Sequence, residues 1–129
     1  MVFEDIKITD LEVELTRQSD TASGLRYMYL KLSGSPPSEW SEIFRAEREF
    51  PRHTMWRRAW IQGDYIVIDC APDEIEKYHL RDLKQDVDNS NRKYKDYLAL
   101  VERKRESARN EKEEEKKKLN DLKNKLNFD

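Results

Sequence analysis

The sequence predicts an α+β fold: a small antiparallel four-stranded sheet (β-β-α-β-β) with one short helix, followed by a long C-terminal helix that forms a coiled coil. The first observation behind this prediction is that all 3 glycines and all 4 prolines lie within residues 1–72. The second is an alternation of apolar and polar residues in the N-terminal half, which is typical of strands. The third is a seven-residue apolar repeat in the C-terminal half. We therefore expect a head domain at residues 1–71 and a C-terminal helix at residues 72–129.

The first two strands are predicted on either side of a polar turn. Residues 6–17 ("IKITDLEVELTR") alternate and are rich in β-branched side chains, and residues 25–32 ("LRYMYLKL") form the second strand. Within the first strand the apolar residues change parity near Thr9 and Asp10. A β-bulge at this point would return them to one face of the sheet.

A short helix is predicted within residues 35–50 ("SPPSEWSEIFRAEREF"). Ser38 is expected as its N-cap, and Pro51, which cannot continue a helix, is expected to stop it. Trp40, Ile43 and Phe44 recur at helical spacing, so the helix should present one apolar face to the sheet. We expect this helix and the start of the long helix to cover one face of the sheet.

A β-hairpin is predicted over residues 55–70 ("MWRRAWIQGDYIVIDC"), with Gly63 and Asp64 as a two-residue type II′ turn. Such a turn sets the register of the two strands. On one side Ile61 then faces Ile66, and Ala59 faces Ile68. On the other side Trp60 faces Val67, Arg58 faces Asp69 and Gln62 faces Tyr65, with Trp56 beside them.

The alternation gives the sheet an aliphatic face, which is the natural core, and an aromatic face. Tyr, Trp and Arg are enriched at protein-binding hot spots, so the aromatic face could bind a partner protein. Its rings could also stack the bases of single-stranded RNA or DNA, or a helix could simply cover them. The predicted partner-binding residues are Tyr27, Tyr29, Trp56, Arg58, Trp60 and Tyr65.

The C-terminal helix keeps its seven-residue repeat from Leu80 onward, with Leu98 at position a and Val101 at position d. A repeat held over several turns predicts helix pairing. The alternatives are a solvated single helix, which Glu–Lys pairs four residues apart would stabilise, and a parallel dimer or other oligomer.

The charged residues in the repeat favour an antiparallel dimer. In a parallel dimer Arg105, Lys112 and Glu115 would each meet their own copy in an apolar seam, which is costly. When the second copy is reversed about Asn110, Arg105 meets Glu115 and Lys112 meets Ala108. The apolar pairs are then Tyr94 with Leu126, Leu98 with Leu122, and Val101 with Leu119.

Composition limits the other function classes. Apolar residues make up 36% of the chain and charged residues 40%, with a net charge of −2, so no strong field attracts nucleic acid. Residues 1–50 carry 6 Lys/Arg against 10 Asp/Glu, which also disfavours nucleic acid on the head domain. The single cysteine, the absence of an apolar leader and the lack of a long apolar run predict a cytoplasmic protein with no membrane contact.

Catalytic residues are sparse. His53, His79 and Cys70 are the candidates for a base or a nucleophile, but no sequence pattern pairs them. The 2 histidines and 1 cysteine are too few for a structural zinc cluster, and no metal or cofactor is expected.

We therefore expect a non-enzymatic protein-interaction module, such as an adaptor, a regulator or an inhibitor. It would form a homodimer through its antiparallel C-terminal helix and bind another protein through the aromatic face. The alternative is binding of single-stranded nucleic acid on that face.

Overall fold

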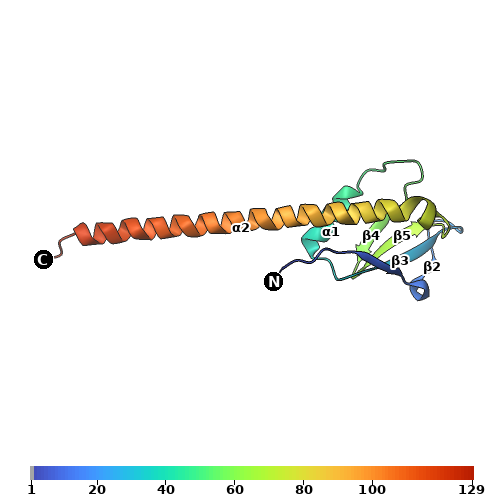
Figure 1. Cartoon of the computed structure of the whole chain (residues 1–129), viewed down its shortest axis with the longest axis horizontal. Helices are drawn as coiled ribbons and strands as arrows, with labels where there is room; N and C mark the ends of the chain where they lie inside the picture. The colour runs from blue at the N-terminus through green and yellow to red at the C-terminus, as the bar shows by residue number, and fades with distance from the viewer. Residues whose placement is uncertain (1) are drawn as a thin grey trace. The chain divides into compact units, whose positions relative to one another are not determined.

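The computed structural model describes residues 2–129 and has the predicted α+β architecture (Figure 1). Its antiparallel sheet has five strands in the order β1-β3-β5-β4, with β2 also pairing with β3. Strand β4 therefore forms one edge of the sheet, and β1 and β2 share the other. The strands are β1 (Ile8–Leu11), β2 (Arg17–Gln18), β3 (Arg26–Leu32), β4 (Ala59–Gln62) and β5 (Tyr65–Cys70).

The predicted first strand is interrupted, which is why the sheet has five strands and not four. A 3₁₀ turn at Val13–Leu15 separates β1 from β2. Val13 and Leu15 are 68% and 41% exposed, so they do not continue the apolar row of β1. The predicted bulge is confirmed, because the register between β1 and β3 shifts between Ile8 and Asp10.

The predicted hairpin register is confirmed over the whole of β4. Ala59 pairs with Ile68, Trp60 with Val67, Ile61 with Ile66 and Gln62 with Tyr65. Gly63 has a φ of +60°, the left-handed region in which a glycine avoids the steric cost of a side chain. Strand β4 is shorter than predicted, however, because residues 53–58 lead to it without strand structure.

The short helix α1 spans Ser38–Glu47 and ends before Pro51, as predicted. The predicted N-cap was wrong by one residue: Pro37 occupies the cap, and Ser38 is the first helical residue. A π-helical turn at Ile75–His79 leads directly into α2, which runs for 46 residues from Leu80 to Lys125.

The aliphatic face of the sheet packs against α1 and the first turns of α2, which confirms the expected layering (Figure 1). The rings of Trp40 and Phe44 in α1 stack with centroids 5.6 Å apart. The buried members of this core are Ile6, Met28, Leu30, Leu32, Trp40, Phe44, Ile66, Ile68, Cys70, Leu83, Val87 and Tyr94.

A buried amide ties the N-terminal segment to both helices. The Asn91 Oδ1 accepts hydrogen bonds from the Ile6 N–H and the Trp40 Nε1–H, each at 2.9 Å. The Asn91 Nδ2 donates to the Ile6 carbonyl at 2.8 Å. Because buried polar groups are costly unless bonded, this set of partners specifies how the three segments pack.

The chain divides into two compact units, residues 1–95 and residues 96–129. We call them the first unit and the second unit. The first unit contains the whole sheet, α1 and the start of α2, and the second contains the rest of α2. The coiled coil that the repeat predicts, and the domain boundary at residues 71 and 72, stay predictions.

Candidate interaction surfaces

The second face of the sheet carries a cluster of aromatic rings, as the alternation predicted. Tyr27 and Trp60 meet edge to face with centroids 5.8 Å apart, and Tyr29 and Tyr65 do the same at 5.8 Å. Val67 is fully buried beneath them. The structure thus brings together five of the six predicted partner-binding residues. Four of them are the rings of this cluster, and the fifth is Arg58, which lies over Trp60.

A cation lies over a ring at each side of this cluster. Arg17 lies 4.8 Å from the Tyr27 ring centroid, Lys31 lies 4.8 Å from that of Tyr65, and Arg58 lies 4.9 Å from that of Trp60. Lys31 is also paired with the carboxylate of Asp64, which raises the pKa of Lys31 and lowers that of Asp64.

The centre of the aromatic face is closed. Tyr27 and Tyr29 are only 8% and 7% exposed, because neighbouring rings and cations cover them. Trp60 is half-buried and Arg58 is exposed. Of the six predicted residues, those that stay accessible on this face are therefore Arg58, Trp60 and the half-buried Tyr65, all in the β4–β5 hairpin or directly before it.

The side chain of Arg58 does not form the ion pair that its register with Asp69 suggested. The Asp69 N–H does donate to the Arg58 carbonyl at 3.0 Å, so the backbone pairing is present. The Asp69 carboxylate, however, accepts a hydrogen bond from Thr21 Oγ1 at 2.8 Å. The guanidinium of Arg58 instead lies over Trp60.

Trp56 does not belong to the aromatic face. Arg48 and Arg52 lie over its ring at 4.0 and 4.6 Å, and His53 meets it edge to face at 5.3 Å. Trp56 is thus part of a separate cluster in the segment that joins α1 to β4, and the alternation of the sequence does not extend to it.

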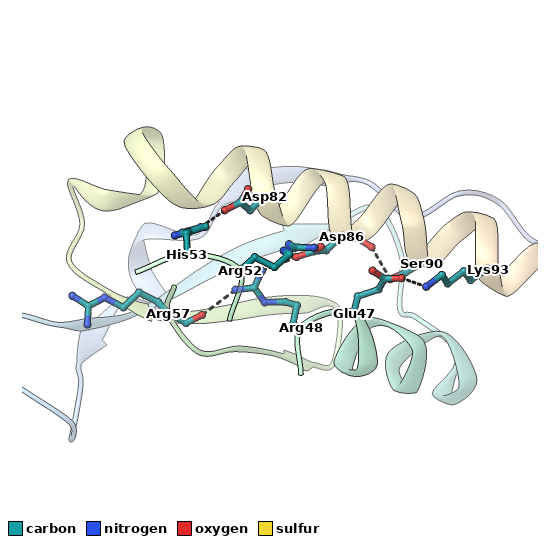
Figure 2. Close-up of polar contacts among 9 residues, drawn as sticks. All are labelled: Glu47, Arg48, Arg52, His53, Arg57, Asp82, Asp86, Ser90 and Lys93. Atoms are coloured by element: carbon teal, nitrogen blue, oxygen red, sulfur yellow. Dashed lines mark hydrogen bonds and ion pairs between the residues drawn. The ribbon is translucent and has the colours of Figure 1, made fainter. Parts of the chain in front are cut away.

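This separate cluster is built on the buried carboxylate of Asp86, which the sequence did not single out (Figure 2). Arg48 and Arg52 each donate to one of its oxygens at 2.7 Å. Arg48 also donates to the Arg57 carbonyl at 2.9 Å, and Ser90 Oγ donates to the Asp86 carbonyl at 2.6 Å. Burial lowers the pKa of Arg48, and the bond to Asp86 acts against this by favouring the charged form.

Two further polar contacts fasten the same region to α2. His53 Nε2 lies 2.7 Å from the Asp82 carboxylate, and Lys93 pairs with Glu47 at the end of α1 (Figure 2). The segment after α1 is therefore held along α2 by charged contacts. A hint of this lies in the sequence, because Asp86 and the small polar Ser90 fall on the same helix stripe as buried Leu83 and Val87.

Glu74 links the end of the hairpin to the start of the long helix. Arg57 donates to both of its carboxylate oxygens, at 2.9 and 3.0 Å, and His79 Nε2 lies 3.0 Å from one of them. The bonds from Arg57, with a smaller contribution from His79, lower the pKa of Glu74 to about 2.

The three candidate catalytic residues lie in structural settings. His53 and His79 are each in contact with a carboxylate, as described above. Cys70 is fully buried, and burial raises the pKa of its thiol to about 12, far from the range of a reactive thiolate. Within residues 2–129 no cluster of His, Cys, Asp and Glu has the arrangement of a metal site.

A groove of about 730 Å³ runs between α1 and the edge strand β4. Its α1 side is formed by Glu42, Arg45, Ala46, Arg48 and Glu49. Its strand side is formed by Arg58, Ala59 and Trp60, so two predicted partner-binding residues line it.

The second unit exposes a row of apolar side chains. Leu98, Leu119 and Leu122 are 36%, 58% and 51% exposed, and Val101 is half-buried. All other predicted dimerisation residues in this unit, which are Arg105, Ala108, Lys112, Glu115 and Leu126, are exposed.

Two predicted dimerisation residues lie outside this helical row. Tyr94 is buried in the core of the first unit, where its ring meets Phe3 at 4.7 Å. Leu126 follows the last helical residue, Lys125.

Across the described part of the chain, α2 included, no helix combines the length and the apolar character needed to cross a membrane. Comparison with models of known protein families, with curated proteins and with solved structures finds no match for this chain.

Proposed function

We propose that this protein is a non-enzymatic interaction protein, which pairs with a second copy through the second unit and binds a partner protein through the first. The observation that carries the proposal is the state of the long helix. From residue 95 to residue 129 no side chain is buried, yet leucines recur at heptad positions along it. A helix that leaves such a row uncovered gains stability by pairing.

Apolar burial is the driving force for this pairing. Burial of each apolar side chain in the seam would contribute about 1–2 kcal/mol to the free energy of association, less than for a fully exposed side chain. These side chains are Leu98, Val101, Leu119 and Leu122. The two copies contribute the same set, so the gain is doubled, and association must overcome its entropic cost.

Charge in the middle of the seam sets the direction. With the second copy reversed about Asn110, Arg105 meets Glu115, whereas a parallel pair would oppose like charges at both positions. Because Tyr94 serves the core and Leu126 lies past the helix end, the proposed seam runs from Leu98 to Leu122.

Distances between spin labels test the orientation. Cysteines placed at positions 98 and 122, in a Cys70→Ala background, carry the labels in separate preparations that are then mixed. The antiparallel dimer brings label 98 of one copy close to label 122 of the other. Close approach of 98 to 98, or sedimentation as a monomer at high concentration, would overturn the proposal.

Protein binding by the first unit is supported by Arg58 and Trp60, which remain accessible at the edge of the aromatic face. Single-stranded nucleic acid is the second candidate, and the cations Arg17, Lys31 and Arg58 beside the rings favour it. The buried rings of Tyr27 and Tyr29 offer little area for base stacking, so we favour a protein partner.

Titration with labelled single-stranded RNA separates these candidates. If the nucleic-acid function holds, affinity falls steeply as salt is raised. The protein-binding proposal expects no measurable RNA affinity at physiological salt.

A further inference from the structure

We infer that the open edge of β4 is a docking site for an extended segment of a partner protein, which adds a strand to the sheet and sets an acidic side chain beside Arg58. This inference rests on the proposed protein-binding function of the first unit and names the chemistry of the partner. It does not depend on pairing of the second unit.

The backbone of β4 has hydrogen-bonding groups to offer. In an antiparallel pair, residues alternate between those bonded to the neighbouring strand and those whose N–H and C=O point away from it. The Asp69 N–H bonds the Arg58 carbonyl, so Trp60 and Gln62 continue the bonded set. Ala59 and Ile61 therefore direct their N–H and C=O outward, because β4 is the last strand of the sheet.

The groove between α1 and β4 follows this edge. Consecutive strand residues point to opposite faces, so a groove lined by Arg58, Ala59 and Trp60 together lies along the edge and not over one face. Its volume of about 730 Å³ is within the usual range of binding clefts, about 300–1,000 Å³. Addition of a strand at an open edge is an established mode of peptide recognition.

The side chains at the edge specify what the added strand would carry on each face. On the aromatic face its side chains would lie beside Arg58 and Trp60, as cross-strand neighbours do. On the other face they would lie between Ala59 and Ala46 of α1, where both lining residues are small. Small lining residues leave room for a branched apolar side chain, so the segment should alternate acidic residues with apolar ones such as valine.

Charge favours an acidic residue at the Arg58 position. Of the arginines that line the groove, Arg45 is paired with Glu42 and Arg48 with Asp86. Among the ion pairs within residues 2–129, none includes Arg58, and this side chain is exposed. The carboxylates that line the groove, those of Glu42 and Glu49, come from the α1 side, and Glu42 is paired with Arg45.

The experiment is an NMR titration of the full chain with a short synthetic peptide in which glutamate alternates with valine. We expect the Ala59 and Ile61 amides to shift and their hydrogen exchange to slow by at least about tenfold at saturation, as newly formed hydrogen bonds protect them. The Trp60 amide, already bonded to β5, serves as the internal control and should change little.

Two control peptides separate strand addition from simple charge attraction. A glutamate–valine peptide with N-methylated backbone cannot pair with an edge, and a lysine–valine peptide has the wrong charge. Each should bind at least about tenfold more weakly, which corresponds to about 1.4 kcal/mol. Equal binding of the N-methylated peptide would refute strand addition.

The Arg58→Glu variant supplies the matched test on the protein. The variant should bind the glutamate–valine peptide more weakly and the lysine–valine peptide more tightly, because the charge at position 58 is reversed. Since Arg58 is exposed, its replacement leaves the core unchanged. If the peptides bind with no protection at Ala59 and Ile61, or if only RNA shifts these amides, the inference is wrong. Failure of the spin-label test would leave this result unaffected, so the two outcomes are distinguishable.

Discussion

Asp86 is the residue on which the packing of the first unit depends most directly. Its carboxylate is fully buried, yet both of its oxygens receive a guanidinium hydrogen bond at 2.7 Å. Arg48 is nearly as deeply buried, with 4% of its side chain exposed. Taking either charge out of water is costly, and the hydrogen-bonded pairing of the two charges offsets that cost.

Replacement of Asp86 by Asn should therefore destabilise the protein strongly. The variant keeps the shape of the side chain but leaves the buried Arg48 charge without its counter-ion, at a cost of about 3–5 kcal/mol. Urea denaturation followed by circular dichroism measures the free energy of unfolding. The matched control is Asp88→Asn, an exposed aspartate on the same helix, which should change that free energy by less than about 0.5 kcal/mol.

Glu74 makes stability depend on pH. Its folded pKa of about 2 lies below the ordinary value of 4.5, because Arg57 favours the charged form. The stabilising contribution is therefore fully present above pH 4.5 and is lost as the pH falls from 4.5 toward 2.

The Glu74→Gln variant isolates this contribution. Wild type should be more stable than the variant near neutral pH, and the difference in free energy of unfolding should shrink as the pH is lowered from 4.5 toward 2. A difference that stays constant over this range would show that the Arg57–Glu74 pair does not account for it.

At the scale of the elements, the hairpin is the part of the fold with the strongest local determinants. Gly63 adopts a φ of +60°, and a Cβ at this position would meet no atom within 4 Å. The cost of replacing it is therefore one of backbone conformation alone, about 1–2 kcal/mol for an L-residue in the left-handed region.

Gly63→Ala should lower the free energy of unfolding by this amount. Gly24→Ala is the control, since Gly24 also has open space around it but no positive φ. That change should be neutral, or should stabilise by up to about 1 kcal/mol by restricting the unfolded chain. Thermal unfolding of both variants provides the measurement, and equal losses would contradict the argument.

The long helix shows why one sequence pattern cannot by itself distinguish packing on a sheet from pairing with another helix. Val87 and Tyr94 occupy repeat positions, and Asn91 lies on the same stripe, yet all three are buried within the first unit. A helix that packs on a sheet and a helix that pairs with another both need an apolar stripe along one side. The repeat alone could not tell where packing on the sheet ends, and in the structure the last core residue of the helix is Tyr94.

At the scale of the whole molecule, the proposed dimer depends on charge more than on apolar area. The chain is 40% charged, and the middle of the seam carries Arg105, Lys112 and Glu115. The orientation of the two helices in the dimer should therefore change or weaken when these charges are reversed, whereas a purely apolar seam would not respond to charge.

A charge-swap series tests this dependence. Arg105→Glu should weaken the dimer by at least about tenfold, because it sets glutamate against Glu115 of the second copy at two symmetric places. The double variant Arg105→Glu, Glu115→Arg should restore the wild-type affinity in sedimentation equilibrium. A parallel dimer would show no such rescue, since each residue would still meet its own copy.

The sequence by itself determined the features that depend on neighbours along the chain. The turn at Gly63 and Asp64 specified the hairpin register, and the alternation of aromatic with aliphatic residues in β3 specified the two faces of the sheet. The sequence did not reveal the interruption of the first strand. The 3₁₀ turn at Val13–Leu15 has the same apolar–polar alternation as a strand.

Only the tertiary structure decided which charged residues meet. Arg48 and Asp86 are separated by 38 residues, and Arg57 and Glu74 by 17. In a chain so rich in charge, no local pattern distinguishes these pairs from the many that remain in solvent. Trp56 and Trp60, close in sequence, were likewise separated into different clusters, because the strand begins only at Ala59. Pairings of this kind arise from burial against distant elements, and burial is a property of the folded whole.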